Sequence, residues 1–119
     1  MASQTKHIIT GNKGEATAAS YLIEKGYQLC CRNFRYKRAE VDIIAQKDKV
    51  LVFVEVKTRG SDKFGFPEEA VSAKKEAMLL AAAEEYIHQT DWHHDIRFDI
   101  ISITLSTPPV IYHIEDAFH

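Results

Sequence analysis

This sequence has few cysteines with which to form disulfide bonds or a structural zinc site. Its 119 residues include two cysteines. Cys30 and Cys31 are adjacent in an expected strand, where successive side chains point to opposite faces and cannot easily bridge each other. No C-x-x-C pair is present, so neither a disulfide framework nor a structural zinc site is expected. We expect small packed thiols in a reducing compartment instead.

Long apolar segments and the motifs of several enzyme classes are missing too. The uncharged apolar run over residues 50–54 is far below the ~20 residues of a membrane span, and residues 1–7 lack the apolar stretch of a secretory signal. The glycine motifs of serine hydrolases, P-loop enzymes and dinucleotide-binding enzymes are absent. We therefore expect a cytoplasmic protein with no membrane contact and no small-molecule cofactor. It should fold as one domain over residues 1–119, with an N-terminal arm over residues 1–9.

Charge of each sign is concentrated in a different half of the chain. Residues 1–60 carry 11 basic and 6 acidic groups, whereas residues 61–119 carry 4 and 11. The densest basic patch interleaves aromatic residues and comprises Arg32, Phe34, Arg35, Tyr36, Lys37 and Arg38. This pattern suits phosphate contacts and base stacking, and it is equally typical of a solvated strand edge. The second half has acidic residues that form either a protein-interaction surface or a solvated helical face: Glu68, Glu69, Glu84 and Glu85.

Residues 12–25 have the pattern of a helix, with Asn12 as N-cap and Gly26 as a left-handed stop. The expected core positions of this helix are Ala18, Ala19 and Leu22. Glu15 precedes them by three, four and seven residues, so it projects onto the same interior stripe. Spacing alone leaves two interpretations open: Glu15 completes a capping box with Asn12, or its carboxylate faces a buried site.

Three strands are predicted next, over residues 27–36, 40–47 and 50–57, with a tight turn at Asp48-Lys49. The third strand begins apolar on both faces, as a central strand does. If the turn has two residues, one face of this hairpin carries two adjacent rungs of charge. Those rungs pair Asp42 with Glu55 and Glu40 with Lys57.

The rest of the chain predicts a loop over residues 58–66, a long helix, and two strands over residues 97–105 and 110–114. The helix is expected to enter at Pro67 and to be established by Ser72. Its expected core positions are Ala73, Ala77, Leu80, Ala83 and Ile87. The element order α-β-β-β-α-β-β predicts an α/β fold in which helices flank a central mixed β-sheet of about five strands.

The acidic pair across the hairpin points to metal chemistry. Carboxylates directly opposite in an antiparallel pair have Cβ atoms ~4.5–5.5 Å apart and repel each other. Mg²⁺ would compensate them, because it takes oxygen ligands from one or two carboxylates and keeps water or phosphate oxygens elsewhere. Asp42 and Glu55 are the candidate ligands, and Lys57 would orient the attacking water or offset charge on a scissile phosphate. A surface salt-bridge ladder is the alternative.

A wider set of motifs resembles a known family. Asp42, followed after twelve residues by Glu55-Val56-Lys57, is the D…E-x-K signature of PD-(D/E)xK nucleases. The accompanying motifs are Gly11-Asn12-Lys13-Gly14-Glu15, Arg32-Asn33-Phe34-Arg35, Glu40-Val41-Asp42, Phe53-Val54-Glu55-Val56-Lys57-Thr58-Arg59, Lys75, Arg97-Phe98-Asp99 and Ala117-Phe118. Together they resemble the bacterial YraN family of small predicted endonucleases over residues 8–118. The resemblance implies a restriction-endonuclease-like core, similar to that of archaeal Holliday-junction resolvases.

The resemblance also implies roles for the residues at matching positions. The catalytic set would be Glu15, Asp42, Glu55 and Lys57. Asp42, Glu55 and the Val56 backbone carbonyl would ligate Mg²⁺, for which Mn²⁺ would substitute. The phosphate backbone of DNA, branched DNA included, would be contacted by Arg32, Arg35, Lys37, Arg38 and Arg59. Ala39 stands where the family usually has glycine, which leaves each expected ligand in place.

Three hypotheses for the function follow. The first is a metal-dependent endodeoxyribonuclease that hydrolyses phosphodiester bonds in branched or damaged DNA. The second is a non-catalytic nucleic-acid-binding module of the same fold. The third is a protein-interaction domain that acts through the acidic second half. A homodimer is expected for an enzyme that cuts two strands symmetrically, although the sequence identifies no interface.

Overall fold

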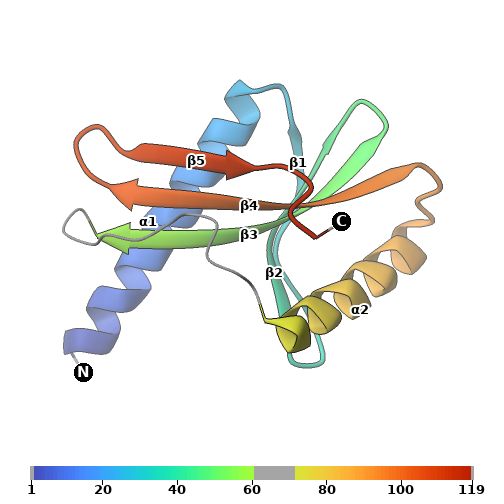
Figure 1. Ribbon diagram of the computed structural model, residues 1–119, viewed down its shortest axis with the longest axis horizontal. Coiled ribbons are helices and arrows are strands. Elements are labelled where there is room, and N and C mark those ends of the chain that lie inside the picture. The colour runs from blue at the N-terminus through green and yellow to red at the C-terminus, as the bar shows by residue number, and fades with distance from the viewer. Residues whose placement is uncertain (1, 61–71, 119) are drawn as a thin grey trace.

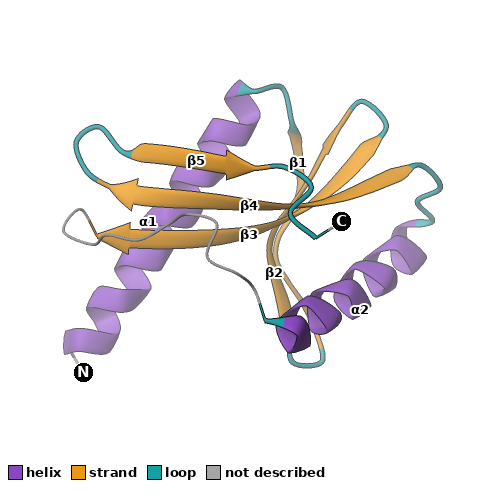
Figure 2. Ribbon diagram, viewed as in Figure 1, coloured by secondary structure: helices purple, strands orange, loops and turns teal. Residues whose placement is uncertain are grey.

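A computed structural model describes residues 2–60 and 72–118, with the side chains of the first helix described from Lys13 onward. These residues form two helices and five strands in the predicted order (Figure 2). The helices are α1 (Ala2–Glu24) and α2 (Ala73–Thr90). The strands are β1 (Gln28–Tyr36), β2 (Ala39–Lys47), β3 (Val50–Gly60), β4 (Asp95–Leu105) and β5 (Val110–Ile114).

The five strands lie in one sheet in the order β1-β2-β3-β4-β5. Strands β3 and β4 are parallel, and the other neighbours are antiparallel. The mixed α/β sheet predicted from the sequence is therefore confirmed, with β3 at its centre. Parallel neighbours need a crossover connection, and α2 supplies it between β3 and β4 (Figure 1). The predicted turn at Asp48-Lys49 is also confirmed, since Lys47 pairs with Val50.

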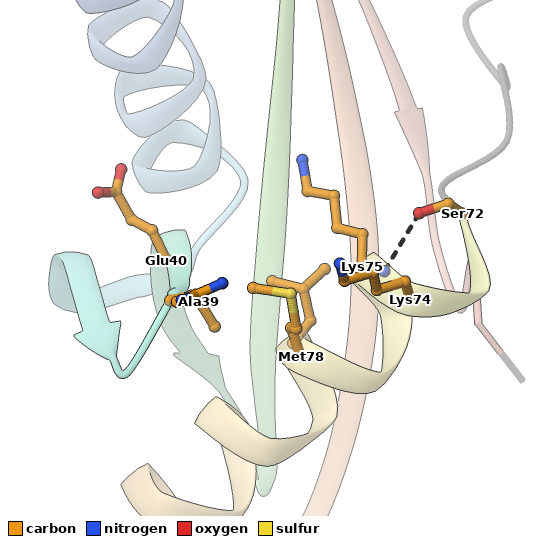
Figure 3. A pocket seen from close by; sticks show the side chains of 8 residues that line it. Ala39, Glu40, Ser72, Lys74, Lys75 and Met78 are labelled. Atoms are coloured by element: carbon orange, nitrogen blue, oxygen red, sulfur yellow. Dashed lines mark hydrogen bonds between the residues drawn. The ribbon is translucent and has the colours of Figure 1, made fainter.

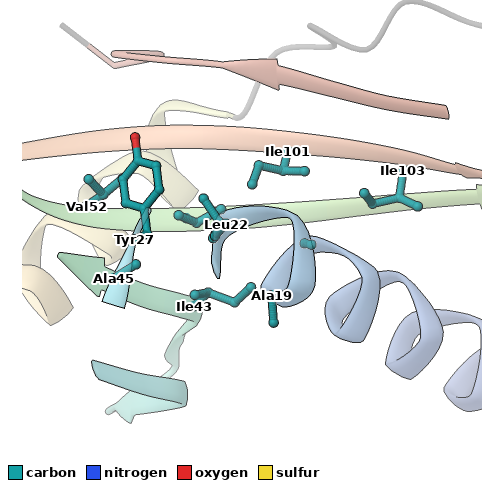
Figure 4. Packing of buried hydrophobic residues seen from close by; sticks show 10 residues of the cluster. Ala19, Leu22, Tyr27, Ile43, Ala45, Val52, Ile101 and Ile103 are labelled. Atoms are coloured by element: carbon teal, nitrogen blue, oxygen red, sulfur yellow. The ribbon is translucent and has the colours of Figure 1, made fainter. Parts of the chain in front are cut away.

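Helix α1 covers one face of the sheet. It buries Ala18, Ala19 and Leu22, as the sequence predicts. These side chains pack against Ile43, Val52, Ile101 and other residues of β2, β3 and β4 (Figure 4). The small residues Ala18 and Ala19 let the helix pack close to the sheet. The helical residues that precede them therefore also lie near the strands.

Helix α2 covers the opposite face, but with a stripe of residues different from the one predicted. Leu79, Ala82 and Ala83 are buried, whereas Leu80 is exposed. Of the expected core positions Ala83 is correct, Ile87 packs at the margin, and Ala73 and Ala77 are exposed. The core face predicted for this helix was wrong because Leu79 and Leu80 are adjacent, and the helical spacing of apolar residues suits either one.

The ends of several elements differ from the predictions. Helix α1 begins at Ala2 and includes the segment expected as an arm, so Asn12 lies inside the helix and is not its N-cap. Strand β3 continues through Gly60, into the expected loop. The expected entry of the second helix at Pro67 lies outside the described residues, and within them Ser72 is the N-cap.

The glycine stop after α1 is confirmed, and the cysteines are unbridged as predicted, although Cys30 is exposed and not packed. Gly26 ends α1 with φ of 95°, and the backbone N–H of Tyr27 donates to the carbonyl oxygen of Leu22 (2.9 Å). Cys30 and Cys31 are both free thiols. In the described parts of the chain, no helix is both long and apolar enough to cross a membrane.

A buried aspartate, Asp99, ties β4 to the C-terminal segment. Its carboxylate accepts hydrogen bonds from Arg97 Nε (2.8 Å) and Nη2 (2.9 Å), from His113 Nε2 (2.7 Å) and from the backbone N–H of Asp116 (3.1 Å). The Tyr21 hydroxyl lies 3.0 Å from the other ring nitrogen, Nδ1, of His113. Burial raises the pKa of Asp99, but the hydrogen bonds from His113 and Arg97 outweigh it, and the pKa lies below its ordinary value.

Candidate metal centre

Strand β2 changes the direction of its side chains at Asp42. Val41 packs in the cluster under α2, whereas Ile43, two residues later, packs under α1. Residues two apart share a face in a regular strand, so the alternation is broken between them. The pairing of β2 with β3 correspondingly runs only as far as Ile43 opposite Val54.

The neighbouring strand is distorted at the same level, where Asn33 has φ of 55°. Asparagine tolerates this left-handed region better than most residues. Because of the break, the predicted rungs that pair Asp42 with Glu55 and Glu40 with Lys57 are absent from the ladder. Glu40 turns toward α1, whereas Glu55 lies on the α2 face of β3, so the prediction of a single shared face was wrong.

Asp42 lies at the break and interacts both with the backbone of β3 and with the acidic residues on the α1 side. Its Oδ2 accepts a hydrogen bond from the backbone N–H of Val56 (2.7 Å), the residue after Glu55. One of its carboxylate oxygens also belongs to a cluster with Glu15 and Glu40. In this cluster each residue offers an oxygen within 4.8 Å of the other two. Acidic residues from α1 and β2 thus converge at one place, and the backbone N–H of Val56, the residue after a fourth acid, is hydrogen-bonded to Asp42.

Glu15 reaches this cluster because α1 passes very close to β3. Gly14 is buried, and a Cβ atom placed on it would lie 2.8 Å from Thr58 Cβ and 2.7 Å from Thr58 Cγ2. Glycine is therefore required by the close approach and not by its conformational freedom. The capping role for Glu15 is wrong, because Asn12 and Glu15 lie within the helix and not at its first turn.

Two arginines and an asparagine from β1 face the outer carboxylates. Asn33 Nδ2 donates to Glu15 Oε1 (3.1 Å) and to Glu40 Oε1 (3.3 Å). Arg32 Nη2 lies 3.4 Å from Glu15 Oε1, and Arg35 Nε lies 2.8 Å from Glu40 Oε2. The outer part of the cluster is thereby partly compensated by exposed cationic side chains.

Glu55 has a different partner, on the other face of the sheet. Lys75 Nζ from the first turn of α2 lies 2.7 Å from Glu55 Oε1. The Glu55 side chain is only 10% exposed. Its second oxygen, Oε2, is buried and has no hydrogen-bond partner among the residues that the structure describes. An unmatched buried carboxylate oxygen is costly, and it marks a position that a cation would satisfy.

The pKa of Asp42 reflects both its burial and the negative charge around it. Its pKa is raised from 3.8 to about 7, chiefly because burial disfavours the charged form. The hydrogen bond from Val56 opposes the rise. Repulsion adds to it and comes from three carboxylates: Glu55, Glu15 and Glu40. A cation at this position would favour the ionised form of Asp42 and would remove that repulsion.

These residues fit a hard divalent cation. The donor set consists of carboxylate oxygens, which Mg²⁺ and Mn²⁺ prefer. The structure supports the fit with the orphaned oxygen of Glu55 and the raised pKa of Asp42. The carboxylates of Glu15, Glu40 and Asp42 could hold such an ion, with Glu55 beside Asp42.

The other residues named from the sequence lie around this cluster. Lys57 follows Glu55 by two residues in β3 and is half-buried, and Arg59 lies near the end of the same strand. Lys37 and Arg38 form the turn between β1 and β2. Lys37 Nζ stacks over the Tyr36 ring at 5.2 Å from its centroid. The structure therefore brings the basic hairpin and the acidic cluster to the same part of the sheet.

Only two of the acidic residues considered as a protein-interaction surface, Glu84 and Glu85, lie in the described parts of the chain. Glu84 is exposed on α2, and Glu85 accepts a hydrogen bond from Gln89 (2.7 Å). Glu68 and Glu69 lie outside the described residues. A role for these residues stays a prediction.

Sequence reasoning did not assign Glu40, Asn33 and Lys75 to the site. Glu40 was placed on the charged face, and its spacing of two from Asp42 was a usable signal. Lys75 was noted only as part of a motif. It is 20 residues from Glu55 in the sequence, and only the packing of the crossover helix α2 brings the two side chains together. Asn33 was also noted only as part of a motif, and its left-handed backbone gave no signal in the sequence.

Known proteins similar to this chain match it over nearly its whole length. A family model described as "Uncharacterised protein family UPF0102" matches residues 14–103. A UPF0102 protein of Flavobacterium johnsoniae is 44% identical over 119 residues, with 96% of this chain and 97% of the relative covered. UPF0102 proteins of Flavobacterium psychrophilum and Phocaeicola vulgatus are 42% and 41% identical over 115 residues, each with 96% of this chain covered and with 97% and 95% of the relative. The chain therefore belongs to the UPF0102 family, the family that its motifs identified as YraN.

Proposed function

We propose that this protein is a metal-dependent endodeoxyribonuclease that hydrolyses phosphodiester bonds, with branched or damaged DNA as its substrate class. The observation that carries the proposal is the convergence of Glu15, Glu40 and Asp42 within 4.8 Å, beside a buried Glu55 whose second oxygen has no described partner. A purely structural cluster would be expected to have its buried oxygens satisfied by donors.

The proposed roles divide among the residues of the cluster. Asp42 and Glu55 hold a divalent cation, with the Val56 carbonyl as a further ligand, and Glu15 and Glu40 hold its water shell or complete the ligand set. Such a cation, when bound, supplies an activated water and offsets the charge of the phosphate. Lys57 orients the attacking water or offsets the charge that develops on the phosphate.

DNA is proposed to approach from the side of the basic hairpin. Lys37 and Arg38 form its turn, and Arg32 and Arg35 lie on the adjoining strand. The phosphate backbone would exchange the contacts that Arg32 and Arg35 make with Glu15 and Glu40 for contacts with phosphate oxygens. Arg59 of β3 would add a further phosphate contact.

A cleavage assay with a matched pair of variants tests the proposal. Linear, flap and four-way-junction DNA are incubated with the wild type, Asp42→Asn or Lys57→Ala in Mg²⁺ or Mn²⁺. We expect the wild type to cut at least one substrate, and each variant to lose cleavage by about 10²- to 10³-fold while DNA binding survives. Asp48→Asn is the control, because it makes the same chemical change in the exposed β2–β3 turn.

One outcome would favour the non-catalytic alternative. If the wild type binds DNA in a salt-dependent manner and cuts none of the three substrates with either metal, the chain is a nucleic-acid-binding module. If it neither binds nor cuts DNA, and a protein partner is recovered after nuclease treatment, the protein-interaction hypothesis is favoured instead.

A further inference from the structure

We propose that Lys75 competes with the metal for Glu55 and that, when a divalent cation binds, its ammonium moves to a DNA phosphodiester group in the adjoining cavity. This inference rests on the proposed function, because it requires both the cation and the DNA. It adds a coupling between the two ligands that the acidic cluster alone does not provide.

Lys75 contacts only one oxygen of the Glu55 carboxylate. Its Nζ lies 2.7 Å from Glu55 Oε1 and leaves Oε2 without a described partner. The ammonium is a point charge that satisfies only one of the two oxygens. Repulsion between an ammonium and a divalent cation a few ångströms apart is strong in a partly buried site. Lys75 therefore cannot keep this contact at full strength once the ion is bound.

Lys75 can leave Glu55 while its backbone stays in place. Its side chain is 49% exposed and extends from the first turn of α2, and its backbone N–H is held by the Ser72 hydroxyl (3.1 Å). The backbone is thus anchored while the long side chain is only half covered. Rotation of that side chain is enough to move the ammonium away from Glu55 without displacing the helix.

A cavity of about 250 Å³ lies between the β1–β2 turn and the start of α2, and Lys75 is part of its lining. Figure 3 shows Glu40 and Lys75 on opposite sides of it. Two further cations, Arg38 and Lys74, line it, and neither forms an ion pair within the described residues. Three cationic side chains from two elements around one open cavity favour an anion with several oxygens, such as a phosphodiester.

The consequence is a reciprocal coupling. If the metal releases Lys75 to bind phosphate, then metal raises the affinity for DNA, and DNA raises the affinity for metal by the same factor. In the metal-free protein, Lys75 instead stabilises Glu55 and keeps one cation away from the DNA-binding surface.

Mn²⁺ binding to the whole protein without DNA provides the first test, with free Mn²⁺ followed by electron paramagnetic resonance. We expect Lys75→Met to bind Mn²⁺ about tenfold more tightly than the wild type, because the competing charge is gone. Lys75→Arg keeps a cation at this position and should not show the gain. Lys49→Met, at the exposed β2–β3 turn, is the matched control and should bind like the wild type.

A second test uses the wild type alone and therefore does not require any variant to fold. The rate of acetylation of Lys75 by acetic anhydride, measured by mass spectrometry, should increase several-fold when Mn²⁺ is added, since the ammonium is then no longer held by Glu55. The rate at Lys49 should not change. Equal rates at Lys75 with and without Mn²⁺ would contradict the release.

DNA affinity completes the test, with Ca²⁺ as a cation for binding without turnover. Ca²⁺ should tighten binding of a DNA duplex by the wild type about five- to tenfold, and Lys75→Met should lose most of this gain. The gain from Ca²⁺ should not be seen when inorganic phosphate, at the same phosphate concentration, is the ligand in place of DNA. If it is seen, the assignment to DNA is wrong.

The outcomes separate this inference from the proposed function. If Mn²⁺ binds the wild type and not Asp42→Asn, while Lys75→Met binds as the wild type does, the metal site stands and the competition is overturned. If Mn²⁺ does not bind the wild type at all, both proposals fail.

Discussion

Two aspartates in the same sheet, Asp42 on β2 and Asp99 on β4, have opposite surroundings. Asp99 accepts four hydrogen bonds, two of them from the Arg97 guanidinium, and its pKa is lowered. Asp42 accepts one from the Val56 backbone and has three carboxylates around it, and its pKa is raised to about 7. Both are substantially buried, so burial alone does not explain the difference.

The contrast teaches which acidic group is structural and which can act as a ligand. At Asp99 the protein supplies as many hydrogen-bond donors as the carboxylate can use, and nothing is left for a ligand. At Asp42 it supplies too few, and the shortage extends to the buried oxygen of Glu55. A cluster that is costly without a cation is the kind of site that binds one. Substitutions at the two aspartates should therefore have different effects.

The largest expected effect is on stability at Asp99. Asp99→Asn removes the charge that compensates Arg97 in a buried network, and it should lower the free energy of unfolding by about 3–5 kcal/mol. Asp42→Asn should leave the stability of the metal-free protein unchanged or raised at pH 8, because it relieves repulsion. Urea unfolding at pH 8 without metal measures both, with Asp48→Asn as a control. Similar losses at the two aspartates would abolish the distinction.

The next effect is a pH dependence that belongs to Asp42. The pKa of Asp42 is higher in the folded state than in the unfolded chain. Between about pH 4 and pH 7 the folded protein therefore holds a proton that the unfolded chain has already released. Stability contributed by this group therefore falls as pH rises through that window and is constant above it. From pH 5 to pH 8 the wild type should lose about 2–3 kcal/mol relative to Asp42→Asn.

Urea unfolding of the two proteins at several pH values checks this difference. Addition of 10 mM Mg²⁺ at pH 8 should restore stability to the wild type and not to Asp42→Asn, because a ligand that binds only the folded state stabilises it. A wild-type stability that rises from pH 5 to pH 8 relative to the variant would contradict the raised pKa.

Gly14 should affect the acidic cluster without touching Asp99. Gly14→Ala places a methyl group against Thr58, so α1 must move away from β3 at a cost of about 1–3 kcal/mol. Because Glu15 is the next residue, Mn²⁺ affinity should fall as well. In the Thr58→Gly background the same substitution should cost less, as a double-mutant cycle would show. Asp99→Asn is the opposite case, with lost stability and unchanged Mn²⁺ affinity in the folded protein.

The sequence predicted most of the fold from local patterns. Strand β3 was expected at the centre because both of its faces begin apolar, and the α1 stripe of Ala18, Ala19 and Leu22 was correct. The start of α1 could not be placed, since the Asn12 and Glu15 pattern of a capping box also occurs inside a helix. Patterns that one segment determines were thus predictable, whereas helix ends with competing signals were not.

The site was predictable in its members more than in its geometry. The residue types and spacings of Asp42 and Glu55 pointed to metal chemistry, and the structure brings Asp42 together with Glu15 as the inward-facing position of Glu15 suggested. The change of direction at Asp42 was not predictable, because a period of two assumes an undistorted strand. It lies at the level of Asn33 in the neighbouring strand, whose backbone is left-handed.

The smallest effect is expected for Arg35, whose partner Glu40 belongs to the acidic cluster. The Arg35 side chain is 78% exposed, against 22% for Arg97. Exposed ion pairs contribute little, so Arg35→Ala should change the free energy of unfolding by less than about 1 kcal/mol, whereas Arg97→Ala leaves Asp99 buried without its charged partner and should cost several times more. Arg35→Ala should nevertheless increase Mn²⁺ affinity a few-fold, because it removes a competing cation. Urea unfolding and Mn²⁺ titration of both variants measure these effects, and an arginine on β1 that stabilises the fold as strongly as Arg97 would show that the cluster is already compensated without a metal.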